Sequence, residues 1–215
     1  MKKLILFIGF LASTSGLFAQ MYGGNAAMAA LNSGDVSTID NVTTVNIIYD
    51  YSETGVGAFK KESDYLTKRT KEMNDKKPGS GDKMATNWQE GKKGRYEPKF
   101  QDLFTKYGTK SLKMGGVNYA TNNDITLVVK TTFIEPGINI GIYKKPAYVD
   151  MECIFRDKTG KDLVAFFVKN SLGEQAMGFD YDVSSRIVES YGRAAKMLVS
   201  IIAKERKKAA KGKKK

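Results

Sequence analysis

Two acidic side chains in the carboxyl-terminal half have the spacing that acid–base chemistry needs. Asp150 and Glu152 lie two residues apart in a run, residues 147–157, whose hydrophobicity alternates as in a β-strand. Residues two apart on a strand share a face, and a retaining glycosidase needs two carboxyl groups about 5 Å apart. The pair is therefore the first candidate for catalysis by a carbohydrate-active enzyme. Lys and Arg are plentiful nearby, so cross-strand ion pairing on a solvated face explains the same residues without catalysis.

The composition excludes the commonest other catalytic chemistries. The chain has no His and a single cysteine, Cys153. It therefore cannot build a Ser-His-Asp or Cys-His site, a His-ligated metal centre, a multi-cysteine zinc site or an internal disulfide. Because Cys153 faces the core side of its predicted strand, its thiol is expected to be unreactive.

A candidate ligand site begins in residues 76–94. This segment carries the only tryptophan among several Gly and Pro residues, which predicts a loop or lid between two helices. Aromatic rings interleaved with cations can stack on sugars or bases and hold acidic groups. The alternative is a tryptophan that fixes a long loop to the core. The candidate ligand-binding residues are Trp88, Lys92, Lys93, Arg95 and Tyr96.

A short acidic pattern near the last helix is a weak candidate for a metal site. Asp180, Asp182 and Ser184 form an Asp-x-Asp-x-Ser spacing that could offer oxygen ligands to calcium. The Gly and the later Glu of a complete calcium loop do not follow at the required positions. Capping of the last helix explains Asp182 better, so we expect no metal and no cofactor.

Residues 1–19 have the pattern of a secretory signal peptide. Two lysines precede an apolar run, and small and polar residues follow up to Ala19. Cleavage after Ala19 would place the protein in the periplasm or outside the cell. A lipoprotein would need a cysteine directly after the cleavage point, whereas the single cysteine is Cys153, so we expect no lipid anchor. No later stretch is apolar and long enough to span a bilayer.

The positive charge is concentrated at the carboxyl terminus. The chain has a net charge of +12, and residues 204–215 contain eight basic residues and one Glu, a net of +7. Such a block repels itself and either stays disordered or extends the preceding helix as a frayed end. It predicts an anionic envelope surface or an envelope protein as partner, and the alternative is a solubilising tail with no partner. Nucleic acid is disfavoured because most of the charge lies outside the predicted fold. The residues expected to bind the anionic surface are Lys207, Lys208, Lys211, Lys213, Lys214 and Lys215.

A single α+β domain must position these candidates. Hydrophobic patterning predicts a flexible leader at residues 20–42, a domain at residues 43–203 and a basic tail at residues 204–215. The order of elements indicates a largely antiparallel sheet of about four strands with two to three packed helices. The predicted strands are residues 43–52, 125–134, 147–157 and 161–170, and the predicted helices are residues 58–75, 97–112 and one beginning near Asp182.

Three segments carry a family resemblance. They are WQEGKKGRYEPKF at residues 88–100, TFIEPGINIGI at residues 132–142, and FDYD at residues 179–182 followed by Arg186 and Ile187. They resemble a family of uncharacterised exported proteins from Gram-negative gut and oral bacteria, over roughly residues 45–204. The resemblance implies export and a single domain and supplies no catalytic residues. The order of elements is also loosely similar to auxiliary domains of outer-membrane transport and assembly systems, which is a similarity of architecture alone.

These observations together predict an exported, non-enzymatic accessory or binding protein of the bacterial cell envelope, with a basic carboxyl-terminal tail for anionic surfaces. The alternative is a carbohydrate-active enzyme that uses an Asp/Glu pair.

Overall fold

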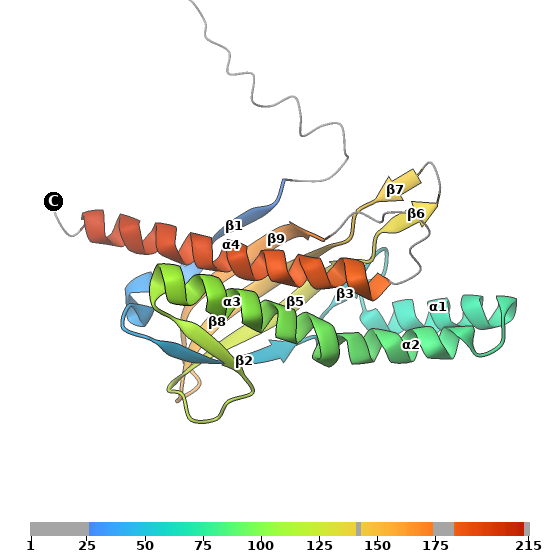
Figure 1. The fold of residues 1–215 in the computed structure, drawn as a ribbon, viewed down its shortest axis with the longest axis horizontal. Coiled ribbons are helices and arrows are strands. Elements are labelled where there is room, and N and C mark those ends of the chain that lie inside the picture. Colours follow the sequence, from blue (N-terminus) through green and yellow to red (C-terminus); the bar gives the residue numbers. More distant parts are fainter. Residues whose placement is uncertain (1–25, 141–142, 174–182, 213–215) are drawn as a thin grey trace, which may run out of the picture.

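The computed structural model describes residues 26–140, 143–173 and 183–212, which form a mixed β-sheet and its helices (Figure 1). The seven-stranded sheet has the order β1–β9–β8–β5–β2–β4, and the short β3 pairs with β5. The strands are β1 (Met28–Gly34), β2 (Thr44–Asp50), β3 (Gly55–Val56), β4 (Gly115–Asn118), β5 (Ile125–Glu135), β8 (Tyr148–Asp157) and β9 (Asp162–Leu172), with β6 (Ile138–Ile140) and β7 (Tyr143–Lys145) in a separate pair. The helices are α1 (Glu62–Lys76), α2 (Ser80–Gly91), α3 (Glu97–Leu112) and α4 (Val183–Gly212), with a 3-10 helix at Val36–Ile39 and a π-helical turn at Lys92–Tyr96.

The α+β class is confirmed, but the prediction of about four strands in a largely antiparallel sheet is wrong. β1, β9, β8 and β5 are antiparallel neighbours, whereas β2 pairs in parallel with both β5 and β4. Parallel strands need a crossover connection, and α1, α2 and α3 all lie between β2 and β4 in the sequence. The missed strands β1, β3 and β4 are short or rich in Ala and Gly, so they give little β-strand signal.

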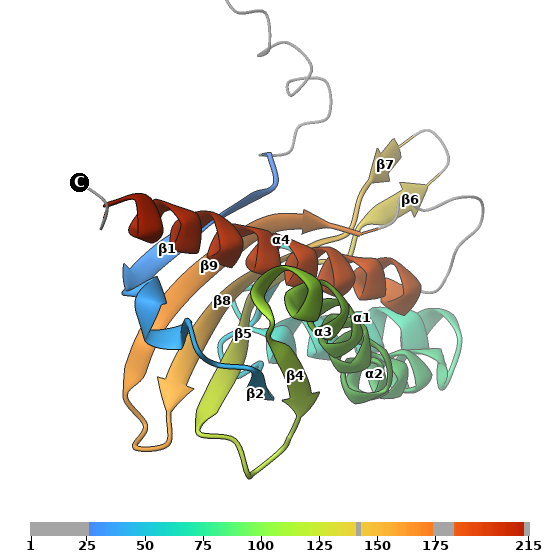
Figure 2. The ribbon, with the colours of Figure 1, turned by 60° about the vertical axis from the view of Figure 1, so that its left-hand side comes forward.

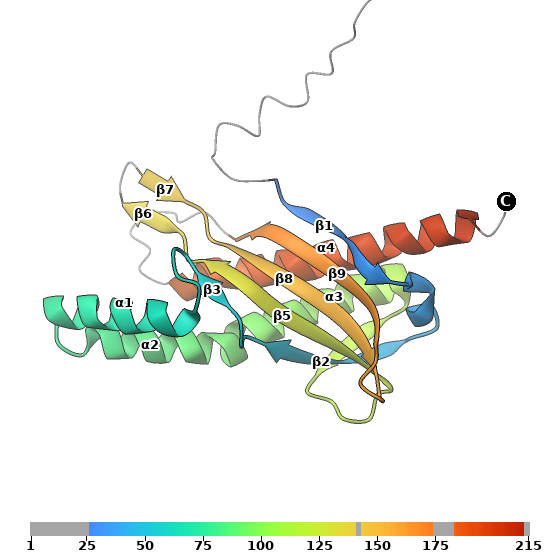
Figure 3. The same cartoon turned by 180° about the vertical axis from the view of Figure 1, so that it is seen from behind.

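α3 and α4 lie side by side across one face of the sheet (Figures 1 and 2). Phe100 and Phe104, one helical turn apart on α3, are fully buried, as their spacing predicts. Gly192 lets the two helices approach closely, because a Cβ atom at this position would lie 2.7 Å from Leu103 Cδ1. The sheet and α4 complete the core with Leu127, Val129, Cys153, Phe155, Phe166, Leu198 and Ile202. None of the described helices covers the opposite face of the sheet (Figure 3).

α1 and α2 form a helical hairpin, here called the helical arm, that extends beyond the sheet (Figures 1 and 3). The loop predicted at residues 76–94 is therefore wrong, since most of this segment is helix. Gly79 sits in the turn of the hairpin with φ +79°, a left-handed conformation that favours glycine. At Gly81, a Cβ atom would lie 2.1 Å from the backbone oxygen of Thr70 on α1. The glycines that suggested a loop thus serve a tight turn and close helix packing.

The fold extends past both predicted domain boundaries. β1 and the 3-10 helix lie within residues 20–42, which were predicted to be a flexible leader, and α4 continues as a helix to Gly212 through most of the predicted tail. The predicted signal peptide at residues 1–19 lies outside the described residues and stays a prediction. None of the helices described here is long and apolar enough to cross a membrane.

Candidate functional site

The five residues predicted to bind a ligand lie in α2 and the π-helical turn that follows it. Trp88, Lys92 and Tyr96 are buried, with exposed fractions of 3%, 7% and 0%. Lys93 and Arg95 are exposed. The structure therefore separates the five residues into a buried group and an exposed pair, and they do not form one open binding surface.

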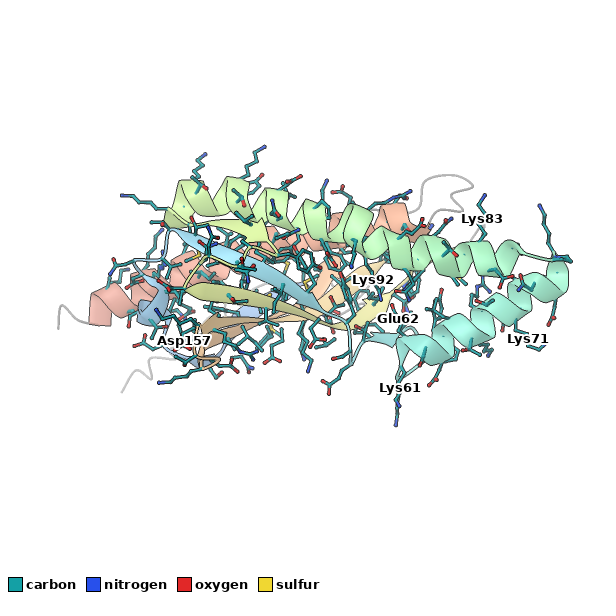
Figure 4. The ribbon with its side chains drawn as sticks, turned by 90° about the horizontal axis from the view of Figure 1, so that it is seen from below. Lys61, Glu62, Lys71, Lys83, Lys92 and Asp157 are labelled. Atoms are coloured by element: carbon teal, nitrogen blue, oxygen red, sulfur yellow. The ribbon has the colours of Figure 1, made fainter. Side chains whose placement is uncertain are left out.

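Glu62, at the start of α1, holds two of the buried side chains (Figure 4). Its Oε1 accepts a hydrogen bond from Trp88 Nε1 at 2.6 Å, and its Oε2 pairs with Lys92 Nζ at 2.6 Å. The side chains of Lys92 and Glu62 are only 9% and 14% exposed, so salt screens their pairing weakly. Sequence reasoning missed Glu62, because no motif links residues that are 26 and 30 positions apart.

Two tyrosines complete this group, which we call the Glu62 cluster: Glu62, Trp88, Lys92, Tyr51 and Tyr65. Lys92 Nζ lies 4.5 Å from the centroid of the Tyr51 ring, a cation–π distance. The ring centroids of Tyr65 and Trp88 are 5.2 Å apart. Burial raises the pKa of the Tyr51 hydroxyl. Because the cluster joins α1 and α2 to the residue after β2, it fixes the helical arm to the sheet.

Tyr96 belongs to the core between the π-helical turn and α4. Its ring stacks on that of Tyr191, with centroids 5.1 Å apart and an interplanar angle of 19°. The Tyr191 hydroxyl lies 2.8 Å from the Thr131 hydroxyl on β5. This chain of contacts links the turn through α4 to the sheet, so Tyr96 is a packing residue and not a platform open to ligand.

Asp150 and Glu152 are half-buried and alternate along β8 with the buried Val149, Met151 and Cys153, so they lie on the face of the sheet opposite the core. Asp150 Oδ1 accepts a hydrogen bond from the backbone N–H of Asn170 at 2.7 Å, and Glu152 Oε1 accepts one from Asn32 Nδ2 at 3.0 Å. Glu152 is also in register with Lys130 on β5. These contacts are typical of strand pairing on a half-exposed face. They assign neither Asp150 nor Glu152 the role of a general acid or a general base.

Cys153 and the short acidic pattern give no site among the described residues. Cys153 is fully buried, and burial raises the pKa of its thiol to about 12. Asp180 and Asp182 lie outside the residues that the structure describes. Within the described ranges, no group of three or more His, Cys, Asp or Glu side chains could hold a metal ion.

A groove between α3 and the carboxyl-terminal half of α4 is the most strongly charged candidate site. Its volume is about 560 Å³. Its lining combines apolar residues, residues with hydroxyl groups and lysines. The lining residues, which we call the basic groove, are Tyr107, Ser111, Lys196, Val199, Ser200, Ala203, Lys204, Lys207, Lys208 and Lys211. The groove thus contains three of the six lysines predicted to bind an anionic surface, while Lys213, Lys214 and Lys215 lie outside the described residues.

The charges of the basic groove are largely unneutralised. Lys208 Nζ pairs with Glu205 Oε1 at 2.6 Å. The other four lysines form no ion pair within the part of the chain that the structure describes. Lys196 Nζ lies 5.7 Å from the centroid of the Tyr107 ring, and this ring is 37% exposed.

Arg206, in the predicted tail, anchors the end of α4 to the rest of the fold. Its Nε pairs with Asp40 Oδ1 at 3.0 Å, and its guanidinium donates to the backbone oxygens of Leu112 and Ile39. Burial lowers the pKa of Arg206 from its usual value, and the nearby Asp40 charge opposes this shift. The basic end of α4 is therefore a positioned helix and not a loose tail.

Comparisons with known proteins give no family for this chain. No protein-family model and no curated protein sequence matches it. A solved structure of a PelC dodecamer from Paraburkholderia phytofirmans aligns with 82% of this chain and 97% of its own, with 10% identity and a TM-score of 0.40. A methionine variant of the same dodecamer aligns with 83% of this chain and 96% of its own, with 9% identity and a TM-score of 0.37. At TM-scores below 0.5 this likeness does not establish a common fold.

Proposed function

We propose that this protein is an exported, non-enzymatic accessory protein of the bacterial cell envelope that binds an anionic surface through the basic end of α4. One observation carries the proposal: five lysines line a single groove on this helix, and only one of them pairs with a carboxylate in the described structure. Export is supported by the signal-peptide pattern of residues 1–19 and by the family resemblance.

The position of these lysines favours a role in binding. Lys211 lies in the last turn of α4, where the helix dipole stabilises a cation. Arg206 holds this end of the helix against the body of the protein through Asp40. The lysines are thereby presented together, and a clustered positive potential attracts polyanions over roughly the Debye length, about 8 Å at physiological salt.

The test compares binding of the purified protein to vesicles of phosphatidylglycerol and of phosphatidylcholine. A tail variant replaces six lysines by Gln and keeps Arg206, because deletion from residue 204 onward would also remove the contact to Asp40. A control variant replaces six exposed lysines elsewhere, so that both variants lose the same charge. The tail variant changes Lys207, Lys208, Lys211, Lys213, Lys214 and Lys215, and the control changes Lys60, Lys61, Lys76, Lys77, Lys83 and Lys161.

We expect the natural protein and the control to sediment with anionic vesicles at low salt and to be released at about 0.5 M NaCl. The tail variant should stay in solution. Equal binding of the tail variant and the control would show that overall charge, and not the end of α4, causes the association. Absence of binding by the natural protein would support a solubilising tail with no partner.

A further inference from the structure

The lysines of the basic groove follow a line along α4. Lys196, Lys204, Lys207 and Lys211 fall within roughly 80° of the helix circumference, given 3.6 residues per turn. At a rise of 1.5 Å per residue, the first and last are about 22 Å apart along the helix axis. A ligand that contacts all four must therefore be long and must carry repeated negative charges.

The groove also contains groups that charge alone does not require. Tyr107 is 37% exposed, and the ammonium group of Lys196 lies over one face of its ring, 5.7 Å from the centroid. Ser111 and Ser200 contribute hydroxyl groups, which can donate and accept hydrogen bonds. An aromatic face, hydroxyl groups and adjacent cations match a sugar ring that carries a carboxylate.

The shape of the site separates a polymer chain from a membrane. A bilayer presents a broad surface to a protein, whereas the lysines here follow one line along α4 and share an open groove with Val199 and Ala203. A flexible chain can lie along the groove and contact both its lysines and its apolar residues.

We infer that the basic groove binds an acidic polysaccharide chain, with its carboxylates on the lysines of α4 and a sugar ring on Tyr107. This inference rests on the proposed function and specifies the anionic surface as a glycan. Because several weak ion pairs act on one chain, the affinity should rise with the length of the glycan.

The test measures binding of labelled oligogalacturonate to the purified protein by fluorescence anisotropy. The groove variant is Lys196→Ala/Lys207→Ala/Lys211→Ala, in which alanine preserves helix propensity. The matched control is Lys61→Ala/Lys77→Ala/Lys83→Ala. These three lysines are exposed: Lys61 and Lys77 flank the two ends of α1, and Lys83 lies on α2. The helical arm lies at the opposite end of the molecule from the end of α4 (Figure 1), and Lys61 and Lys83 point away from the body in Figure 4.

We expect the groove variant to bind oligogalacturonate about tenfold more weakly than the natural protein, because three partly exposed ion pairs are lost. The control variant should change the affinity by less than about twofold. Equal losses in the two variants would overturn the inference. Circular dichroism checks that α4 is intact in each variant.

Substitution of Tyr107 distinguishes a glycan from other polyanions. Tyr107→Ala should weaken binding of oligogalacturonate and leave binding of inorganic polyphosphate unchanged, whereas Tyr107→Phe, which keeps the ring, should preserve both. If Tyr107→Ala leaves glycan binding unchanged, or weakens the binding of both ligands equally, the groove recognises its ligands by charge alone and the inference is wrong. If phosphatidylglycerol vesicles bind and oligogalacturonate does not, the inference fails while the proposed function stands. If no polyanion binds, both fail.

Discussion

The ion pair between Glu62 and Lys92 gives the sharpest prediction about stability. Glu62→Gln removes the negative charge and leaves the ammonium group of Lys92, whose side chain is 9% exposed, without its carboxylate. Removal of one partner of a buried ion pair costs about 3–5 kcal/mol. Lys92 keeps its contact with the Tyr51 ring, so we expect the lower end, about 3 kcal/mol. For a chain of this size, this loss corresponds to a decrease in Tm of about 6–12 °C.

Urea unfolding followed by circular dichroism measures this loss, and Glu72→Gln is the matched control. Glu72 pairs with Lys68 and Arg69 on the same helix, but its side chain is 44% exposed. Exposed pairs contribute little, so the control should change the free energy of unfolding by less than about 0.5 kcal/mol. The double variant Glu62→Gln/Lys92→Met should lose less stability than the sum of its single variants. Similar small losses for Glu62→Gln and the control, or strict additivity in the double variant, would refute the role given to the Glu62 cluster.

Three further predictions concern packing, the thiol and pH. Gly81→Ala should destabilise the protein by about 2 kcal/mol in urea unfolding, because the new Cβ atom would clash with the backbone of α1. Gly94→Ala is the control and should be nearly neutral, because no atom lies within 4 Å of its new Cβ. Equal effects of the two variants would contradict the packing argument. Cys153 is fully buried, and burial raises the pKa of its thiol to about 12. It should therefore react with a thiol reagent at pH 8 no faster than the protein unfolds. Rapid reaction of the native protein would contradict this and show that β8 opens locally. Hydrogen bonds from Thr159 lower the pKa of Asp157 below its usual 3.8, so its stabilising effect is present above pH 3.8 and is lost as the pH falls through the lowered value. Asp157→Asn should therefore lower Tm at pH 6, and the difference from the natural protein should shrink as the pH falls below 3.8; a difference that stays constant would contradict this account.

The long, strongly patterned elements of the fold could be predicted from the sequence. Hydrophobic patterning predicted α3 at residues 97–112, which are its observed bounds. The alternation around Cys153 predicted β8 and its buried face. These elements bury their apolar residues at one helical or strand period, so their local sequence carries the signal. The same argument predicted β9, at residues 161–170.

The remaining elements depend on contacts between distant residues. β1 has the sequence MAALNSG, which gains its strand structure by pairing with β9 and not from its own propensity. α2 was mistaken for a loop because Gly81 was counted as a turn residue, although it permits close packing on α1. The partner of Trp88 and Lys92, Glu62, could not be found from spacing, so the sequence left open both a ligand site and a tryptophan fixed to the core.

The basic end of α4 was found from charge, but its structure was not. A run of lysines predicts a disordered or frayed end. The structure shows a continuous helix to Gly212, because Arg206 is held by Asp40 and by two backbone oxygens. The groove formed with Tyr107 of α3 could not be predicted, since it requires the packing of α3 on α4.

Fractionation of the native host cells at low and at high salt tests the central claim most directly. We predict that the natural protein is found in the envelope fraction at low salt and is released at about 0.5 M NaCl, where the Debye length is about 4 Å. The tail variant with six lysines replaced by Gln should be free at both salt concentrations. A natural protein that is free at low salt, or that stays with the envelope at high salt, would contradict electrostatic attachment through α4.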